Sequence, residues 1–86
     1  MKTGVTDMVV AVCFVNTELG NEVKVRSRLS MFQGVRKVIE LFGEYDFLLI
    51  IDAESLRQVN YIVNHVREID GVKASKTIIG VESEAQ

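Results

Sequence analysis

The distribution of apolar and charged positions along the chain predicts four β-strands. Two continuous apolar runs, residues 8–15 and 47–51, are rich in β-branched side chains, which is typical of strands covered on both faces inside a sheet. Residues 35–42 and 72–81 carry charged side chains among the apolar ones. Charge of this kind is common on edge strands, where it discourages unwanted pairing. We therefore expect a sheet with two central and two edge strands.

Each central strand is followed by a segment whose apolar residues have helical spacing. In residues 21–32 they recur at i, i+4 and i+7 as Val25, Leu29 and Phe32. Ser55 is a favourable N-cap for a second helix, and Gln58 three residues later fits a capping box. The apolar face of that helix is expected to comprise Leu56, Val59, Ile62, Val63, Val66 and Ile69.

Glycine positions indicate an internal repeat. Gly34 and Gly71 each precede a valine at the start of a predicted edge strand, and Gly43 and Gly80 recur at the same interval. Gly34 and Gly71 can end the preceding helix in a left-handed turn at no steric cost. The chain therefore has the pattern of two βαβ units. Right-handed crossovers place both helices on one face of the sheet, which predicts an α+β, ferredoxin-like βαββαβ sandwich with a four-stranded antiparallel sheet in the order 4-1-3-2.

The sheet face opposite the helices is predicted to form a dimer interface. Within residues 8–15 both sets of alternating positions are apolar, whereas the helices can cover only one of them. A large apolar patch on a soluble domain usually marks a protein interface. A chain of 86 residues buries only about 60–65% of its unfolded surface, yet 48% of this chain is hydrophobic. Both observations favour a homodimer.

Composition narrows the function classes. The length predicts one domain, residues 1–86 with a core at 8–81. The formal net charge is −2 and acidic and basic residues are interspersed, so the chain lacks the basic stripe of a nucleic-acid-binding protein. Cys13 is the only cysteine, which excludes an intrachain disulfide and favours a reducing, cytoplasmic location. No run approaches the roughly 20 apolar residues of a membrane span.

The sequence offers little for metal, cofactor or catalytic chemistry. It contains no cysteine and histidine cluster with zinc-ligand spacing and no cofactor motif, so we expect neither group. Cys13 lies within a predicted strand and is interpreted as a small buried hydrophobe. His65, the only histidine, is nine residues after Leu56 and should face solvent on the second helix. We therefore do not expect an enzyme.

Several short motifs occur in the order found in one known family. They are Gly34-Val35, Gly43-x-Tyr45-Asp46, Ser55-Leu56, Ile69-x-Gly71-Val72 and Ser75-x-Thr77-Ile78. Together, across residues 8–81, the chain resembles the effector-binding (RAM) domain of the Lrp/AsnC family of amino-acid-responsive transcriptional regulators. Full-length members carry an N-terminal helix-turn-helix domain, and too few residues precede the first strand here to build one. The resemblance is therefore to stand-alone members.

The resemblance implies a regulatory module without direct contact to nucleic acid. Family members form sheet-packed homodimers that associate into rings, commonly octamers, and bind small effectors, often amino acids, between dimers. It also suggests co-assembly with full-length Lrp/AsnC relatives as a hypothesis. The implied role is amino-acid sensing in the control of amino acid metabolism or transcription.

The turn at residues 43–46 is the expected ligand-binding element. A free amino acid is a zwitterion, and its site must offer donors to a carboxylate and acceptors to an ammonium. Gly43 would let the backbone approach the ligand, and exposed N–H groups in the turn would bind an anion. Asp46 or Glu44 would accept from the ammonium, and the Tyr45 ring would line the pocket. The same four residues could instead form only a hairpin turn.

By the resemblance, Ser75 and Thr77 add hydroxyl groups to the same site. They are two residues apart on a predicted strand and should project from one face. The alternative interpretation is that both are ordinary residues of an edge strand.

Three other functions remain open. The chain could be an assembly-only partner of full-length Lrp/AsnC regulators. It could be an ACT-type regulatory domain, although residues 16–20 contain one glycine where those domains have a glycine-rich turn. It could also be a small dimeric ferredoxin-like enzyme, which the absence of a nucleophile and base pair disfavours.

Overall fold

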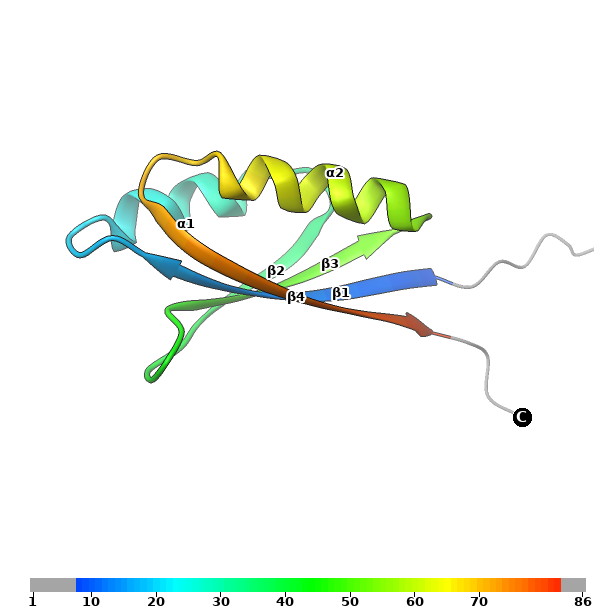
Figure 1. Cartoon of the computed structure of the whole chain (residues 1–86), viewed down its shortest axis with the longest axis horizontal. Coiled ribbons are helices and arrows are strands. Elements are labelled where there is room, and N and C mark those ends of the chain that lie inside the picture. Colours follow the sequence, from blue (N-terminus) through cyan, green and yellow to red (C-terminus); the bar gives the residue numbers. More distant parts are fainter. Residues whose placement is uncertain (1–7, 83–86) are drawn as a thin grey trace, which may run out of the picture.

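The structure, a computed structural model, describes residues 8–82 as a four-stranded sheet with two helices. The elements follow the order β1 (Met8–Thr17), α1 (Glu22–Ser30), β2 (Val35–Glu40), β3 (Phe47–Ala53), α2 (Leu56–Arg67) and β4 (Val72–Glu82). Both helices lie over the same face of the sheet (Figure 1). Within the described residues, neither helix combines the length and the apolar composition needed to cross a membrane.

The sheet has the predicted topology. Its strand order is β2-β3-β1-β4, which is the order 4-1-3-2 read from the other edge. β1 pairs antiparallel with both β3 and β4, so that Val15 lies between Phe47 and Ser75. β2 pairs antiparallel with β3, with a register shift between Val35 and Lys37. The two apolar runs are therefore the central strands and the two charged segments are the edges, as predicted.

The hydrophobic core fills the space between the helices and one face of the sheet. Alternate residues of β1 and β3 are buried and the residues between them are half-buried. The largest fully buried side chains are Phe47, Leu29, Leu49, Ile51, Val15, Val25, Val59, Val66 and Cys13. Burial of an aliphatic or aromatic side chain of this size contributes about 1.5–3 kcal/mol to the stability of the fold. The alternating apolar residues of β1 and β3 therefore determine which face of each strand packs against the helices.

The second helix begins as predicted but differs in two details. Ser55 accepts a 3.1 Å hydrogen bond from the Gln58 backbone N–H and so caps α2. The Gln58 side chain accepts from the backbone N–H of Glu54, at 2.8 Å, one residue before the cap. Leu56 was expected on the buried face but is 55% exposed, as the first residue of α2.

Glycine is required where each helix connects to an edge strand. Gly34 and Gly71 have φ values of +97° and +104°, which L-residues with side chains rarely adopt. A Cβ at Gly34 would lie 2.6 Å from the Ile62 side chain. The second pair of the repeat is not equivalent, because Gly43 lies in the turn after β2, with φ +155°, whereas Gly80 is inside β4.

The face of the sheet away from the helices is uncovered within residues 8–82 (Figure 1) and carries apolar side chains together with Lys37, Asp52 and Lys76. We call it the open face. Its apolar members, placed by the strand register, are Val10, Val12, Phe14, Ile39, Leu48, Ile50 and Ile78. Most are half-buried by their neighbours, and Ile78 is 55% exposed. That this face forms a dimer interface stays a prediction.

Candidate functional site

The turn between β2 and β3 is tied to the end of β1 by Asp46. The Asp46 backbone N–H donates to the Val15 carbonyl at 3.0 Å, and the Asp46 carbonyl accepts from the Leu41 N–H at 2.9 Å. Asp46 Oδ2 accepts hydrogen bonds from the Thr17 backbone N–H at 2.8 Å and from Thr17 Oγ1 at 3.2 Å. Two backbone bonds and two carboxylate bonds thus fix Asp46 beside the end of β1 and the start of β3.

Only one oxygen of the Asp46 carboxylate is occupied by these bonds. Within residues 8–82, Oδ1 has no hydrogen-bond partner or ion pair. The side chain is half-buried, and the bonds from Thr17 hold it in one orientation. Asp46 therefore combines a structural role at Oδ2 with an oriented acceptor at Oδ1, and an ammonium group is a suitable donor to it.

The other residues of the turn have few contacts with the rest of the chain. The Tyr45 ring packs against Phe14 on the open face, with ring centroids 5.1 Å apart and an interplanar angle of 40°. Glu44 is exposed, and the adjacent Phe42 is 95% exposed. No atom lies within 4 Å of the position a Cβ would take at Gly43. The turn extends from the sheet on the side away from the helices (Figure 1).

Ser75 and Thr77 lie on β4, on the face covered by the helices. They pair with Val15 and Cys13 of β1 and are both half-buried, so they share one face as predicted. Thr77 Oγ1 donates to Cys13 Sγ at 3.5 Å. Ser75 Oγ accepts from Arg67 Nε at 2.8 Å, which connects β4 to the last residue of α2.

Within one chain the six predicted residues form two separate groups. β1 lies between β3 and β4, and neighbouring strands are about 4.8 Å apart, so the backbones of Asp46 and Ser75 are about 10 Å apart across the sheet. Tyr45 also lies on the open face, whereas Ser75 and Thr77 lie on the helix face. The turn and the β4 hydroxyls therefore do not surround one ligand within a single protomer.

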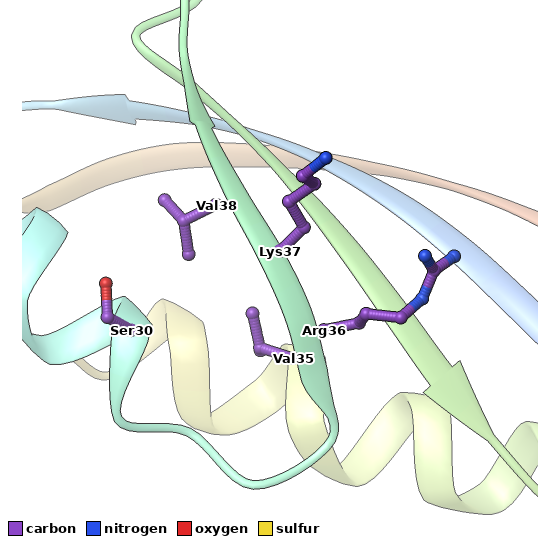
Figure 2. A pocket seen from close by; sticks show the side chains of 5 residues that line it. All are labelled: Ser30, Val35, Arg36, Lys37 and Val38. Carbon is purple, nitrogen blue, oxygen red and sulfur yellow. The ribbon is translucent and has the colours of Figure 1, made fainter.

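A hollow of about 300 Å³ lies elsewhere, beside edge strand β2. Its lining consists of Ser30, Val35, Arg36, Lys37 and Val38. Figure 2 shows Val35 and Val38 pointing toward Ser30, whereas Lys37 and Arg36 point to the other side of the strand. Arg36 is also paired with Asp52 at 2.7 Å. Because its polar groups diverge, this hollow is a poor ligand site, and it contains none of the six predicted residues.

Two residues in this region were not singled out from the sequence. Thr17 orients Asp46, and Arg67 contacts Ser75. Neither belongs to a recognisable motif, since both act through contacts between segments far apart in the chain. An arginine at the end of a predicted helix, followed closely by a serine on the next strand, is the only local signal for the second contact.

Cys13 is buried as predicted, whereas His65, which was expected to face solvent, is half-buried. Cys13 is fully buried, and burial, the largest effect, raises the pKa of its thiol, although the hydrogen bond from Thr77 and the charge of Arg67 lower it. The thiol therefore stays protonated at neutral pH, in contrast to a reactive cysteine. On α2 the ring centroid of His65 lies 4.2 Å from that of Tyr61, and His65 Nδ1 lies 2.8 Å from the Tyr61 carbonyl oxygen.

Comparison with protein families gives a match over nearly the whole chain. A family model described as the Lrp/AsnC ligand binding domain matches residues 10–85. Among curated proteins, the homocitrate synthase of Sulfolobus acidocaldarius is 36% identical over 53 residues, which is 62% of this chain. The chain spans only 11% of the length of that enzyme.

Solved structures share the fold. A hypothetical protein from Pyrococcus horikoshii has a TM-score of 0.79 at 22% identity, with 87% of this chain and 92% of that chain covered. A transcriptional regulator from Neisseria meningitidis, solved as a complex with L-Met, has a TM-score of 0.75 at 15% identity. That match covers 91% of this chain and 53% of the regulator.

Proposed function

The chain belongs to the Lrp/AsnC family through its ligand-binding domain, and from this premise we propose that it is an oligomeric regulatory module that binds a small amino-acid effector. The observation that carries the proposal is the family match, which includes both the turn at residues 43–46 and the β4 hydroxyls. The complex of the Neisseria regulator with L-Met supports an amino acid as the class of ligand.

The proposed site uses Asp46 as the acceptor for the ligand ammonium. Its unoccupied Oδ1 is oriented by the two bonds that Thr17 makes to Oδ2. Gly43, Glu44 and Tyr45 form the rest of the turn. Because Ser75 and Thr77 are on the other side of β1, the proposal requires that a second protomer completes the site. A site between subunits couples ligand binding to assembly, provided that the ligand has different affinities for the two assembly states.

The proposed assembly begins with a homodimer through the open face. Seven apolar side chains from all four strands lie together on this face, and a surface of that kind in water usually marks an interface. Association of such dimers into a ring, an octamer by family resemblance, would then bring a turn of one dimer near β4 of another. Co-assembly with full-length Lrp/AsnC regulators would transmit the ligand signal to transcription.

A thermal-shift screen of the purified chain against the common amino acids tests the sensing function. A ligand that binds only the folded state stabilises it by about 2.7 kcal/mol at a hundredfold excess over Kd, which for a domain of this size raises Tm by about 10–20 °C. We expect a selective rise for one or a few amino acids. A flat response to the whole panel would contradict sensing and would favour the assembly-only function.

Asp46 variants locate the site in the same screen. Asp46→Asn keeps an oxygen that can accept from Thr17 but removes the negative charge, and it should abolish the ligand-induced shift. Glu54→Gln is the matched control, because it removes the charge of an exposed carboxylate at the other end of β3, and it should keep the ligand-induced shift. If both variants respond like the wild type, the ammonium does not bind at Asp46.

A second candidate function is control of an amino-acid biosynthetic enzyme. The observation that favours it is the match to the homocitrate synthase, in which a segment similar to this chain is part of an enzyme. On this hypothesis the chain senses an amino acid and acts on a separate catalytic subunit. The test adds the chain to a homocitrate synthase from which the matching segment is deleted, and measures whether inhibition by amino acids is restored. Unchanged activity with and without the chain would exclude this candidate.

A further inference from the structure

Arg67 and Ser75 form a pair that joins the end of α2 to edge strand β4. Arg67 Nε donates to Ser75 Oγ at 2.8 Å. This bond fixes the plane of the guanidinium, because Nε is the atom through which the group is attached to its side chain. Arg67 is exposed and Ser75 is half-buried, so the pair is accessible at the surface.

The direction of the hydrogen bonds leaves several donors available. A guanidinium has five N–H donors, and only the one on Nε is used within the described residues. Since Ser75 Oγ accepts this bond, its own O–H remains free to donate to another group. Thr77 is different, because its O–H is directed to Cys13 Sγ. The available donors therefore come from Arg67 and Ser75, and they suit an anion.

The positive charge of Arg67 is not neutralised within residues 8–82. The three ion pairs of the described residues join Lys24 to Asp70, Arg26 to Glu40 and Arg36 to Asp52. In each of these pairs a carboxylate both positions and neutralises the cation. Arg67 is positioned by a neutral hydroxyl instead, which orients the guanidinium and keeps its charge available. This arrangement is preorganised for binding an external anion.

On the basis of the proposed function, we propose that Arg67 and Ser75 form the anion-binding half of the effector site and hold the carboxylate of the amino acid. A planar guanidinium with two free Nη groups matches a carboxylate, which it binds through two parallel hydrogen bonds. Ser75 adds a donor from the side. Arg67 could not bind the ammonium, because a guanidinium offers only donors.

This assignment gives the two groups of the candidate site complementary roles. Asp46 offers an acceptor, and the Arg67–Ser75 pair offers donors. Within one protomer β1 lies between the strands that carry them, and the backbones of these strands are about two strand spacings, roughly 10 Å, apart. The proposal is that the acceptor for the ammonium of a ligand bound at Arg67 comes from another copy of the chain.

Acetate provides a direct probe of the anion site. The experiment titrates the ¹⁵N-labelled chain with sodium acetate, with sodium chloride at equal ionic strength, and with inorganic phosphate, and follows the arginine Nε–H resonances by NMR. The Arg67 resonance is assigned by its loss in Arg67→Lys. Arg57, an exposed arginine at the other end of α2 without a hydrogen bond or ion pair among the described residues, is the internal control.

We expect acetate to give a saturable shift at Arg67 and only a weak, linear one at Arg57. Ser75→Ala should weaken acetate binding several-fold while the chain stays folded. Equal responses of the two arginines would overturn the proposal. Phosphate that binds much more tightly than acetate would overturn the assignment to a carboxylate.

An amino acid that shifts Tm of the wild type then provides the second test. Arg67→Gln should weaken its binding about 10- to 100-fold, the effect of losing hydrogen bonds to a charged group. The amide of the same amino acid should bind the wild type poorly and should not distinguish wild type from Arg67→Gln. Arg57→Gln should have no effect. Unchanged binding to Arg67→Gln would overturn the role of Arg67 and leave the proposed function intact. If acetate binds at Arg67 but no amino acid binds the chain, the anion site would stand and the proposed function would fail.

Discussion

The backbone N–H of Thr17 donates a 2.8 Å hydrogen bond to the Asp46 carboxylate and so joins the last residue of β1 to the residue before β3. The motif residue that we assign to the ligand is thus also part of the framework. Stability and ligand binding must therefore be measured separately for any change at Asp46.

Asp46→Ala should lower the free energy of unfolding by about 1–3 kcal/mol. The change leaves the N–H of Thr17, a buried residue, without its acceptor. Urea denaturation measures the effect. Thr17→Val removes only the longer hydroxyl bond and should cost about 1 kcal/mol or less. If Asp46→Ala is no more destabilising than Thr17→Val, the backbone bond has no structural importance.

Val12→Glu should convert the proposed dimer to a folded monomer. Val12 is half-buried at the centre of the open face, opposite Ile50 and Ile78 on the two neighbouring strands. A carboxylate there is tolerated in a solvated monomer but is costly in a dry interface. Light scattering after size exclusion measures the mass. Val23→Glu, at an exposed position of α1, is the matched control and should leave the mass unchanged. A wild-type chain that is already monomeric would contradict the interface.

Gly34→Ala should destabilise the fold more than Gly20→Ala. Both glycines have a positive φ, +97° and +90°, so alanine is strained by about 1–2 kcal/mol at each. Only at Gly34 would the new Cβ meet a neighbour, the Ile62 side chain at 2.6 Å, whereas nothing lies within 4 Å at Gly20. Overpacking adds about 1–3 kcal/mol. Equal destabilisation of the two variants would show that Ile62 moves aside without cost.

Cys13 should make the fold less stable at alkaline pH. Burial, followed by smaller opposing effects of Thr77 and Arg67, raises the pKa of the thiol above its ordinary value of 9.0. Above that value the unfolded chain loses the proton while the folded chain keeps it, so stability decreases as pH rises. Urea denaturation from about pH 8 to about pH 10 should show a weaker dependence on pH in Cys13→Ala than in the wild type. The same slope in both would contradict the burial effect.

The fold could be predicted from the sequence because each local signal agreed with the global arrangement. The apolar runs became the central strands β1 and β3, and Gly34 and Gly71 adopt the left-handed conformation expected after each helix. The errors lie where tertiary context decides. Leu56 has helical spacing but is 55% exposed as the first residue of α2, and Gly80 shares the interval of the repeat without sharing its conformation.

The candidate site could be predicted only in part. Motif order identifies the turn and the β4 hydroxyls, but not that β1 separates Asp46 from Ser75, since this depends on strand order and on which face each residue occupies. The contact of Arg67 with Ser75 depends on how the end of α2 lies over β4, and no sequence period encodes it. The proposed roles of Asp46 as an acceptor and of the Arg67–Ser75 pair as donors depend on these two features of the tertiary structure.

Sedimentation velocity of the wild-type chain, alone and with each common amino acid at millimolar concentration, tests the central claim most directly. The account predicts a species at least as large as a dimer without ligand, and a change in the distribution of larger assemblies with one or a few amino acids. A monomer without ligand, or a distribution that no amino acid changes, would contradict an oligomeric module whose assembly responds to an amino-acid effector.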